Sequence, residues 1–190
     1  MKDLLEIRWH GRGGQGAKTA AQLLAESALD TGKFIQAFPE YGPERAGAPI
    51  RAYTRVSDRE INIHSPVTNP DIVVVVDPTL LETVDVADGL DESGILIVNT
   101  TETVDSVRRK TKYKKGKVAT CDATKISLET LGIPMPNTPM LGALLKIKAV
   151  VPIEALEKEV QKKFLKKIGE EKTQLNIKAI KRAFKETKTG

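Results

Sequence analysis

Two uninterrupted apolar runs and a weaker third one stand out along this chain. Residues 72–77 read Ile-Val-Val-Val-Val-Asp, residues 94–99 repeat the pattern as Gly-Ile-Leu-Ile-Val-Asn, and residues 117–121 form a weaker third copy. Apolar runs without polar alternation are typical of strands that are covered on both faces of a sheet. We therefore expect three central strands in these positions.

Shorter segments predict the remaining strands. Residues 4–9 and 34–38 are strand-like, and Pro39 ends the second of them. Residues 50–56 alternate well enough for a further strand. A polar turn then leads into residues 61–63, so that 50–63 as a whole is expected to form a hairpin.

Helical spacing of apolar residues fills the gaps between these strands. From Ala17 onwards, small and apolar residues recur every three or four positions until Gly32, a residue that commonly stops a helix. Short helices are also expected at 79–91, 101–112, 123–131 and 138–149, and two longer amphipathic helices near 152–167 and 171–187.

Buried strands that alternate with helices predict a three-layer α/β/α sandwich with a mostly parallel, Rossmann-like sheet. The hairpin at 50–63 interrupts the alternation, so the sheet is expected to be mixed. Residues 1–150 are expected to form this α/β domain. Residues 151–190 are expected to form a C-terminal helical extension that packs on it or on a partner subunit.

The positive charge of the chain is concentrated at its C-terminal end. The 190 residues carry a net charge of +5. Residues 151–190 hold 11 Lys and Arg against 6 Asp and Glu, which leaves 19 of each sign in residues 1–150. The tail lacks the interleaved aromatic residues of single-strand binders, so no nucleic-acid partner is expected. A solvated helical surface, or one that docks on another subunit, explains the charge better.

Cysteine use and hydropathy predict a cytoplasmic protein. The single cysteine, Cys121, excludes an internal disulfide framework and any iron–sulfur cluster held by this chain alone. No apolar run approaches the roughly 20 residues that span a bilayer, so no membrane contact is expected. Residues 1–4 lead directly into a strand, so no signal peptide is expected either.

The most informative motif lies between the first strand and the first helix. It consists of Gly11, Arg12, Gly13, Gly14, Gln15 and Gly16, in a G-x-G-x-x-G pattern. Glycines at a strand-to-helix turn let the backbone approach a ligand and leave the first helical N–H groups available for an anion, usually phosphate. The alternative is a tight strand-to-helix turn without a ligand.

Cations near this turn suit a phosphate site. Arg45 and Arg51 flank a Gly- and Pro-rich loop at 40–49 that could fold over the turn. The alternative for Arg51 is an ion pair with a neighbouring carboxylate on the sheet. Polar residues at strand ends, such as Asp77, Asn99 and Asp122, are expected to be helix caps more often than ligand contacts.

The sequence contains no recognisable catalytic arrangement. His10 and His64 are too scattered for metal-ligand spacing, and there is no Ser/His/Asp pattern and no G-x-S-x-G. Cys121 has no activating neighbour. We therefore predict no catalytic residue and no metal site, which is typical of a binding or accessory subunit.

The glycine motif, read as G-R-G-G-Q-G, closely resembles the opening of the γ subunit of 2-oxoacid:ferredoxin oxidoreductases, also found as a γ domain in fused enzymes. The similarity covers about residues 4–150, and the basic helical tail fits a short stand-alone γ chain. It continues at 41–47 (Tyr-Gly-Pro-Glu-Arg-Ala-Gly), Arg51, 63–66, 70–76, 99–100, 122–124 and 137–143.

The resemblance implies a complex that decarboxylates a 2-oxoacid on thiamine diphosphate, reduces ferredoxin through [4Fe–4S] clusters and transfers the acyl group to coenzyme A. It implies α, β and δ partner subunits in a heterotetramer. Thiamine diphosphate and the clusters are then held by the partners alone, ferredoxin is an indirect partner, and coenzyme A is the one cofactor expected on this chain. The chain is expected to be inactive by itself.

The resemblance also suggests which residues meet coenzyme A. Arg45 occupies the place where fused relatives have a lysine near the coenzyme A phosphates, and Gly47 matches the family anchor beside it. Arg51 has no such anchor. The family loop often reads Arg-Gly-Gly, whereas here Arg45 is followed by Ala46, Gly47 and Ala48. The added methyl groups restrict φ and bear on how the loop closes.

Two alternatives to a pyruvate-specific subunit remain. The similarity leans towards pyruvate enzymes, but a γ subunit shared with or specific to a branched-chain 2-oxoacid enzyme is one alternative. The other is a free-standing NAD(P)-binding Rossmann module. Glu40 ends the second predicted strand about 20 residues past the glycine turn, where an acid would hold a ribose diol.

Overall fold

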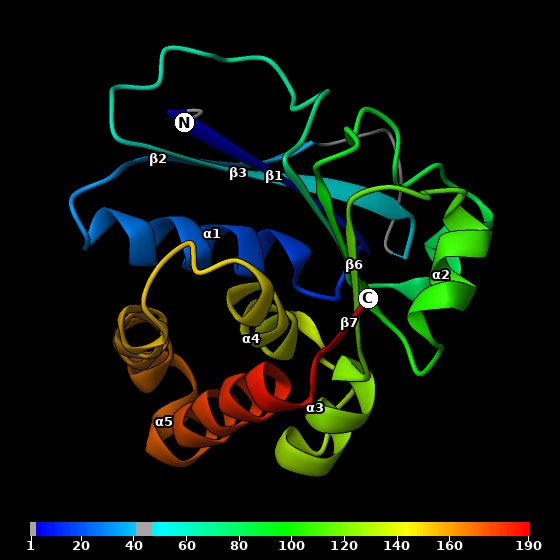
Figure 1. The fold of residues 1–190 in the computed structure, drawn as a ribbon. Helices are drawn as coiled ribbons and strands as arrows, with labels where there is room; N and C mark the ends of the chain where they lie inside the picture. Colours follow the sequence, from blue (N-terminus) through cyan, green and yellow to red (C-terminus); the bar gives the residue numbers. More distant parts are fainter. Residues whose placement is uncertain (1–2, 41–46) are drawn as a thin grey trace.

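The computed structural model describes residues 3–40 and 47–190. Within them, seven strands form one sheet in the order β2-β3-β1-β4-β5-β6-β7 (Figure 1). Five strands share one direction, and β3 and β7 run against it. The predicted mixed, mostly parallel sheet is therefore confirmed. The strands are β1 (Leu4–Arg12), β2 (Phe34–Glu40), β3 (Pro49–Ser57), β4 (Ile72–Val75), β5 (Ile95–Asn99), β6 (Lys117–Cys121) and β7 (Lys188–Thr189).

Helices cover the sheet on both faces, as expected for three layers. One face is packed by α1, α4 and α5, and the other carries a 3-10 helix and α2 over β4–β6 (Figure 1). The helices are α1 (Ala17–Leu29), the 3-10 helix η1 (Pro78–Glu82), α2 (Val104–Thr111), α3 (Ala123–Leu131), α4 (Asn137–Ile147) and α5 (Ile153–Glu186).

The valine-rich strand β4 shows why the centre of the sheet is apolar on both sides. Ile72 and Val74 contribute to the core beneath α1, α4 and α5, whereas Val73 and Val75 contribute to the core beneath α2 and η1. Successive residues of a strand point to opposite faces, so only an unbroken apolar run can fill two cores. The prediction of a doubly covered central strand is confirmed.

The predicted hairpin partner at 61–63 is wrong. No strand forms there; β3 instead pairs antiparallel with β2 on one side and with β1 on the other. The buried guanidinium of Arg55 donates to the backbone carbonyls of Ile63 (3.3 Å) and Ser65 (2.8 Å). These carbonyls are satisfied by a side chain rather than by a ladder, so this segment stays irregular.

The helix expected at 79–91 is also wrong. It is replaced by the short η1, followed by turns around Asp85 and Gly89. The Asp85 carboxylate accepts from the N–H of Ala87, and Gly89 has φ of 72°. Local side-chain bonds and a left-handed residue offer the backbone alternatives to helix.

The C-terminal helices are present, but they meet without a linker. Gly169, with φ of 79° and ψ of 169°, breaks α5 into the two predicted helical stretches. Leu156 and Val160 from the first stretch and Ile180 from the second are buried in the same core as β1 and α1. The short strand β7, which pairs with β6, was not predicted. Two residues are too few to leave a periodic signal.

Candidate functional site

The glycine turn lies where β1 ends and α1 begins. Gly14 and Gly16 adopt φ of 96° and 78°, a region that favours glycine. Gly16 is the N-cap residue of α1 and supplies no capping side chain, and the first turn of α1 contains no acidic residue. The positive end of the helix dipole is therefore not offset by a capping side chain or an acid of that turn.

A hydrogen-bonded lock gives the turn its shape. The side-chain oxygen of Gln15 accepts from the N–H of Arg12 at 2.8 Å, and its amide nitrogen donates to Asp77 at the end of β4. Asp77 also accepts from the N–H (2.9 Å) and the hydroxyl (2.6 Å) of Thr79. Burial raises the pKa of the Asp77 carboxyl, but the bonds from Thr79 and Gln15 outweigh it and hold that pKa below its usual range.

Arg12 is engaged by the protein rather than pointed at open solvent. Its guanidinium lies 3.4 Å from Asp77, donates to Thr79 Oγ1 at 2.9 Å, and donates to the carbonyl of Gly47 at 3.3 Å. The Gly13 N–H donates to Ala48 O at 3.1 Å. The glycine turn is thus tied both to the end of β4 and to the segment that leads into β3.

The other residues predicted to contact the phosphates, Arg45, Gly47 and Arg51, differ in where the structure places them. Arg45 lies outside the described residues. Gly47, with φ of 88°, directly adjoins the glycine turn through its carbonyl bond to Arg12. Arg51, on β3, is half-exposed and lies 3.8 Å from Glu40, so the ion-pair alternative for Arg51 is what the structure contains. Burial and the bond to Glu40 raise the pKa of the neighbouring Tyr53 hydroxyl to about 12.

The strand order disfavours a dinucleotide site. In such a site the acid stands at the end of the strand next to the glycine turn. Here β3 is inserted between β1 and β2, which moves Glu40 about 5 Å further away, by one strand spacing. Its carboxylate is moreover engaged by Tyr53 and Arg51.

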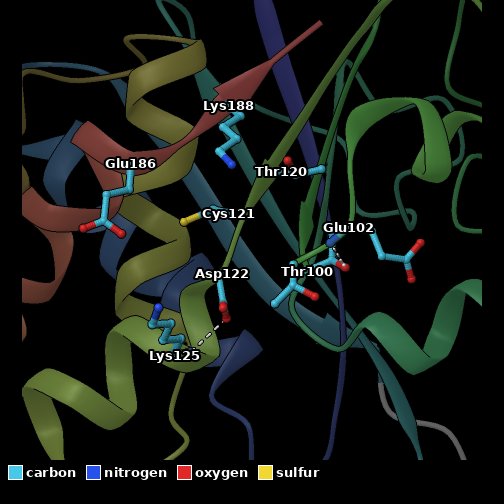
Figure 2. A pocket seen from close by; sticks show the side chains of 9 residues that line it. Thr100, Glu102, Thr120, Cys121, Asp122, Lys125, Glu186 and Lys188 are labelled. Atoms are coloured by element: carbon cyan, nitrogen blue, oxygen red, sulfur yellow. Dashed lines mark hydrogen bonds between the residues drawn. The ribbon is translucent and has the colours of Figure 1, made fainter.

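Of the polar residues at the other strand ends, Asp122 is a helix cap, as expected, and Asn99 is not. Asp122 accepts from the Lys125 N–H at 3.0 Å to cap α3. The helix after Asn99, α2, is capped by Thr103, whereas Asn99 accepts from the Thr124 N–H of α3 at 3.1 Å. A pocket of about 420 Å³ opens beside them, between β6, β7 and the end of β5 (Figure 2). Cys121 lies on its wall, and burial raises the pKa of its thiol to about 11, which disfavours a reactive thiolate.

A second, more apolar pocket of about 450 Å³ adjoins the glycine turn on the side of α4 and α5. Gly14, Gly16 and Thr19 form one wall. Asn137, the first residue of α4, lines it while only 5 % exposed. In the sequence, Asn137 stands in the segment 137–143 that contributes to the family resemblance, but it is not among the predicted site residues. An Asn directly after a proline at a helix start was the available signal, but only the tertiary structure brings it to Gly16.

The part of the chain that the structure describes contains neither a cluster of metal-binding side chains nor a helix that could span a membrane. No group of three or more His, Cys, Asp or Glu side chains is placed to hold a metal ion within residues 3–40 and 47–190. In the same residues, no helix has the length and apolar character needed to cross a bilayer.

Known proteins match this chain over nearly its whole length. The chain matches the family described as pyruvate ferredoxin/flavodoxin oxidoreductase over residues 6–186. It is 51% identical to the pyruvate synthase subunit PorC of Thermotoga maritima over 187 residues, with 98% of this chain and 96% of that protein covered. It is 50% identical to the pyruvate/ketoisovalerate oxidoreductases common subunit gamma of Pyrococcus abyssi, with 97% of each covered.

Solved structures show the same fold. The crystal structure of pyruvate oxidoreductase subunit PORC from Thermotoga maritima superposes with a TM-score of 0.89 at 48% identity, covering 100% of this chain and 99% of that one. A 2-oxoglutarate:ferredoxin oxidoreductase from Magnetococcus marinus shares the fold at a TM-score of 0.79 and 19% identity, with 96% of this chain matching 31% of that one. With the fold and nearly the whole length matched, this chain belongs to the pyruvate ferredoxin/flavodoxin oxidoreductase family.

Proposed function

We propose that this chain is the γ subunit of a heteromeric pyruvate:ferredoxin oxidoreductase, which oxidatively decarboxylates pyruvate to acetyl-coenzyme A and CO₂ and reduces ferredoxin. The observation that carries the proposal is the end-to-end match to relatives that are themselves small subunits of this enzyme class. The chain contributes structure and a coenzyme A site. Its α, β and δ partners supply thiamine diphosphate and the [4Fe–4S] clusters.

The glycine turn supports a coenzyme A role. It combines an uncapped helix N-terminus with a turn shaped in advance by Gln15 and Asp77. Backbone N–H groups at a helix N-terminus are suited to a phosphate. A Cβ on Gly16 would come within 2.5 Å of the Asn137 side chain, so only glycine permits this close packing. Gly47, whose carbonyl accepts from Arg12, and Arg45, two positions before it in the sequence, are the further candidates for the phosphates.

Purification of a tagged copy from its own cells tests the subunit assignment. We expect three further chains to co-purify with iron and with coenzyme A-dependent pyruvate oxidation. A chain that purifies alone, without iron and with NAD(P) affinity but no coenzyme A-dependent activity, would overturn the assignment in favour of a nucleotide-binding module.

Substitution of Arg45 tests the coenzyme A role within that complex. Arg45→Ala should raise the KM for coenzyme A about tenfold, the effect of losing roughly one charge-assisted contact, with the KM for pyruvate unchanged. Arg59→Ala is the matched control, because Arg59 is 81% exposed and its partner is Asp3, far along the sheet from the glycine turn. Equal effects of the two substitutions would count against the role of Arg45.

A second candidate is a γ subunit shared with a branched-chain 2-oxoacid enzyme. It is favoured by the name of the Pyrococcus abyssi relative, a common subunit of pyruvate and ketoisovalerate oxidoreductases. The same purification distinguishes the two candidates. A shared subunit should co-purify with two sets of partner chains, and the preparation should oxidise both substrates. A dedicated subunit should co-purify with a single set.

A further inference from the structure

The pocket beside Cys121 lies at the carboxyl ends of β5 and β6 (Figure 2). Its volume is about 420 Å³, and eight of its nine lining residues are polar. In open α/β sheets, ligands bind beyond the carboxyl ends of the strands. The glycine turn lies at the end of β1, which is three strand spacings, or about 14 Å, from β6, and none of its residues lines this pocket.

Thr120 carries an unpaired hydroxyl at the wall of this pocket. The residue is 3% exposed, and within residues 3–40 and 47–190 its Oγ1 forms no hydrogen bond. The atom is not sealed, because Asn137 Oδ1 is the one fully buried side-chain oxygen or nitrogen without a partner in that part of the chain. Thr120 Oγ1 therefore faces the pocket, where it can donate to an incoming group.

Packing in the sheet does not require a threonine at position 120. Val98 is its register partner on β5, and Val118, two residues earlier on the same face, is fully buried in the core beneath α2. Valine has the same branched shape as threonine and is equally suited to a strand. The hydroxyl is thus the feature of Thr120 that packing leaves unexplained.

Lys188 lies beside this hydroxyl. The antiparallel ladder pairs Thr120 of β6 with Lys188 of β7, so both side chains leave the sheet on the same face, with their Cβ atoms about 5 Å apart. Lys125, from the first turn of α3, also lines the pocket. Both lysines are exposed, and neither forms an ion pair within the described residues.

The three carboxylates that line the pocket are all engaged by the protein. Glu102 contacts Lys110, and Glu186 lies 2.6 Å from Arg182. Asp122 is the cap of α3 and accepts from a backbone N–H of that helix at 3.0 Å. The charged groups of the pocket that lack a partner within the described residues are therefore the two lysines, which favours a negatively charged ligand.

We propose that this pocket binds a small organic anion whose carboxylate or phosphate group accepts hydrogen bonds from Thr120 Oγ1 and Lys188 Nζ, with Lys125 as a second cation. A volume of about 420 Å³ is typical of sites for small molecules. The inference goes beyond the proposed function and does not depend on it, because it concerns other residues and is tested on the chain without its partners.

Calorimetric titration of the full chain with succinate and with glycerol 2-phosphate tests the site. At matched ionic strength, we expect at least one probe to bind with a Kd of about 1 mM or tighter. Tighter binding of succinate identifies a carboxylate ligand, and tighter binding of glycerol 2-phosphate identifies a phosphate ester. If neither probe binds at about 10 mM, the inference is wrong.

Substitution of Thr120 tests the hydroxyl. Thr120→Val should weaken binding of the identified probe about tenfold, because it removes one hydrogen bond to a charged group. Thr120→Ser keeps the hydroxyl and should bind within twofold of wild type. Without ligand, Thr120→Val should not lower the Tm, because the hydroxyl has no partner in the protein. A lower Tm in Thr120→Val, or equal binding by the two variants, would overturn the inference.

Substitution of the lysines tests the charge. Lys188→Gln and Lys125→Gln should each weaken binding of the probe about fivefold, and less in high salt. Lys185→Gln is the matched control, because Lys185 is also exposed near the C-terminal end but does not line the pocket. This variant should bind within twofold of wild type. An equal loss in Lys185→Gln would show a general effect of net charge and would overturn the site.

Discussion

The two faces of strand β1 are both buried, but they are built from opposite chemistry. Ile7 and Trp9 point into the core beneath α1, α4 and α5, and both are fully inaccessible. Arg8 and His10, the alternate residues, point to the other face and are almost as inaccessible, at 3% and 2%. Alternation of apolar and polar residues normally indicates a strand with one solvated face. In β1 the same alternation instead separates two buried faces, one lined by apolar and the other by polar side chains.

The polar interior replaces a helical layer. Over β4–β6 this face is covered by α2 and η1, whereas over β1–β3 it is crossed by the irregular segment after β3 (Figure 1). Irregular backbone carries unpaired carbonyl groups, which must find donors when buried. Arg55 donates to the carbonyls of Ile63 and Ser65 in the segment after β3. Arg8 donates to those of Val86 (3.2 Å) and Asp88, in the turns after η1. Guanidinium groups therefore attach loops to a sheet where no helix packs.

Removal of Trp9 should have the largest effect in this comparison. Trp9→Ala deletes a fully buried indole and its bond from Nε1 to Thr54 Oγ1 at 3.1 Å. We expect the free energy of unfolding, measured by urea titration, to fall by about 4 kcal/mol. Phe34→Ala on the edge strand β2 is the control, because Phe34 is 47% exposed, and its cost should stay below about 1 kcal/mol. A small loss at Trp9 would mean that the apolar face is loosely packed.

Removal of Arg55 should cause the second largest loss in the free energy of unfolding. This side chain is 1% exposed and donates to Glu6 at 2.9 Å, to Gln36 at 3.1 Å and to two backbone carbonyls. Arg55→Ala leaves these acceptors unpaired, so we expect a loss of about 3 kcal/mol in the same urea titration. Amide hydrogen exchange should increase in residues 61–66 before it increases in α1. If exchange instead rises first beneath α1, Arg55 does not attach this segment.

His10 should make stability depend on pH. Burial, then the nearby charges of Arg8 and Arg51, lower the pKa of His10 to about 3. Its ring is therefore neutral when folded but binds a proton when unfolded below about pH 6.5. Stability is fully present above that pH and is lost as the pH falls towards 3, by about 1.4 kcal/mol per unit.

The His10→Gln variant isolates this contribution. Its amide can still accept from Arg8 Nε, which lies 3.0 Å from His10 Nε2. We expect the difference in unfolding free energy between wild type and variant to change by about 2 kcal/mol from pH 7 to pH 5. A constant difference over this range would show that His10 does not titrate on unfolding.

The smallest effect belongs to a surface ion pair at the edge of the same sheet. Lys33 contacts Asp58, and their side chains are 37% and 71% exposed. Lys33→Ala should change the free energy of unfolding by less than about 0.5 kcal/mol, and less still in high salt. A cost close to that of Arg55→Ala would remove the distinction between exposed and buried cations that the comparison draws.

Features that depend on residues close together in the sequence were predictable, whereas features that depend on contacts between separate segments were not. The strands at 72–75, 95–99 and 117–121 were predictable because a doubly buried strand must be apolar along its whole length. The start of α1 was predictable because a strand-to-helix turn with positive φ favours glycine at Gly14 and Gly16. The strand predicted at 61–63 is wrong because three residues cannot show that side chains of other strands, Gln36 and Arg55, take the carbonyls of Ile61 and Ile63.

The sequence by itself determined the α/β class, the position of the glycine turn, the caps Asp77 and Asp122, and the family. Each depends on residues close together in the chain or on an unbroken motif. Only the tertiary structure decided that β3 separates Glu40 from the glycine turn, that Arg12 is held by Asp77 and Thr79, and that Asn137 meets Gly16. Those contacts join segments 25 to more than 100 residues apart. Packing decides such contacts, because local backbone preferences carry no information about which distant segments meet.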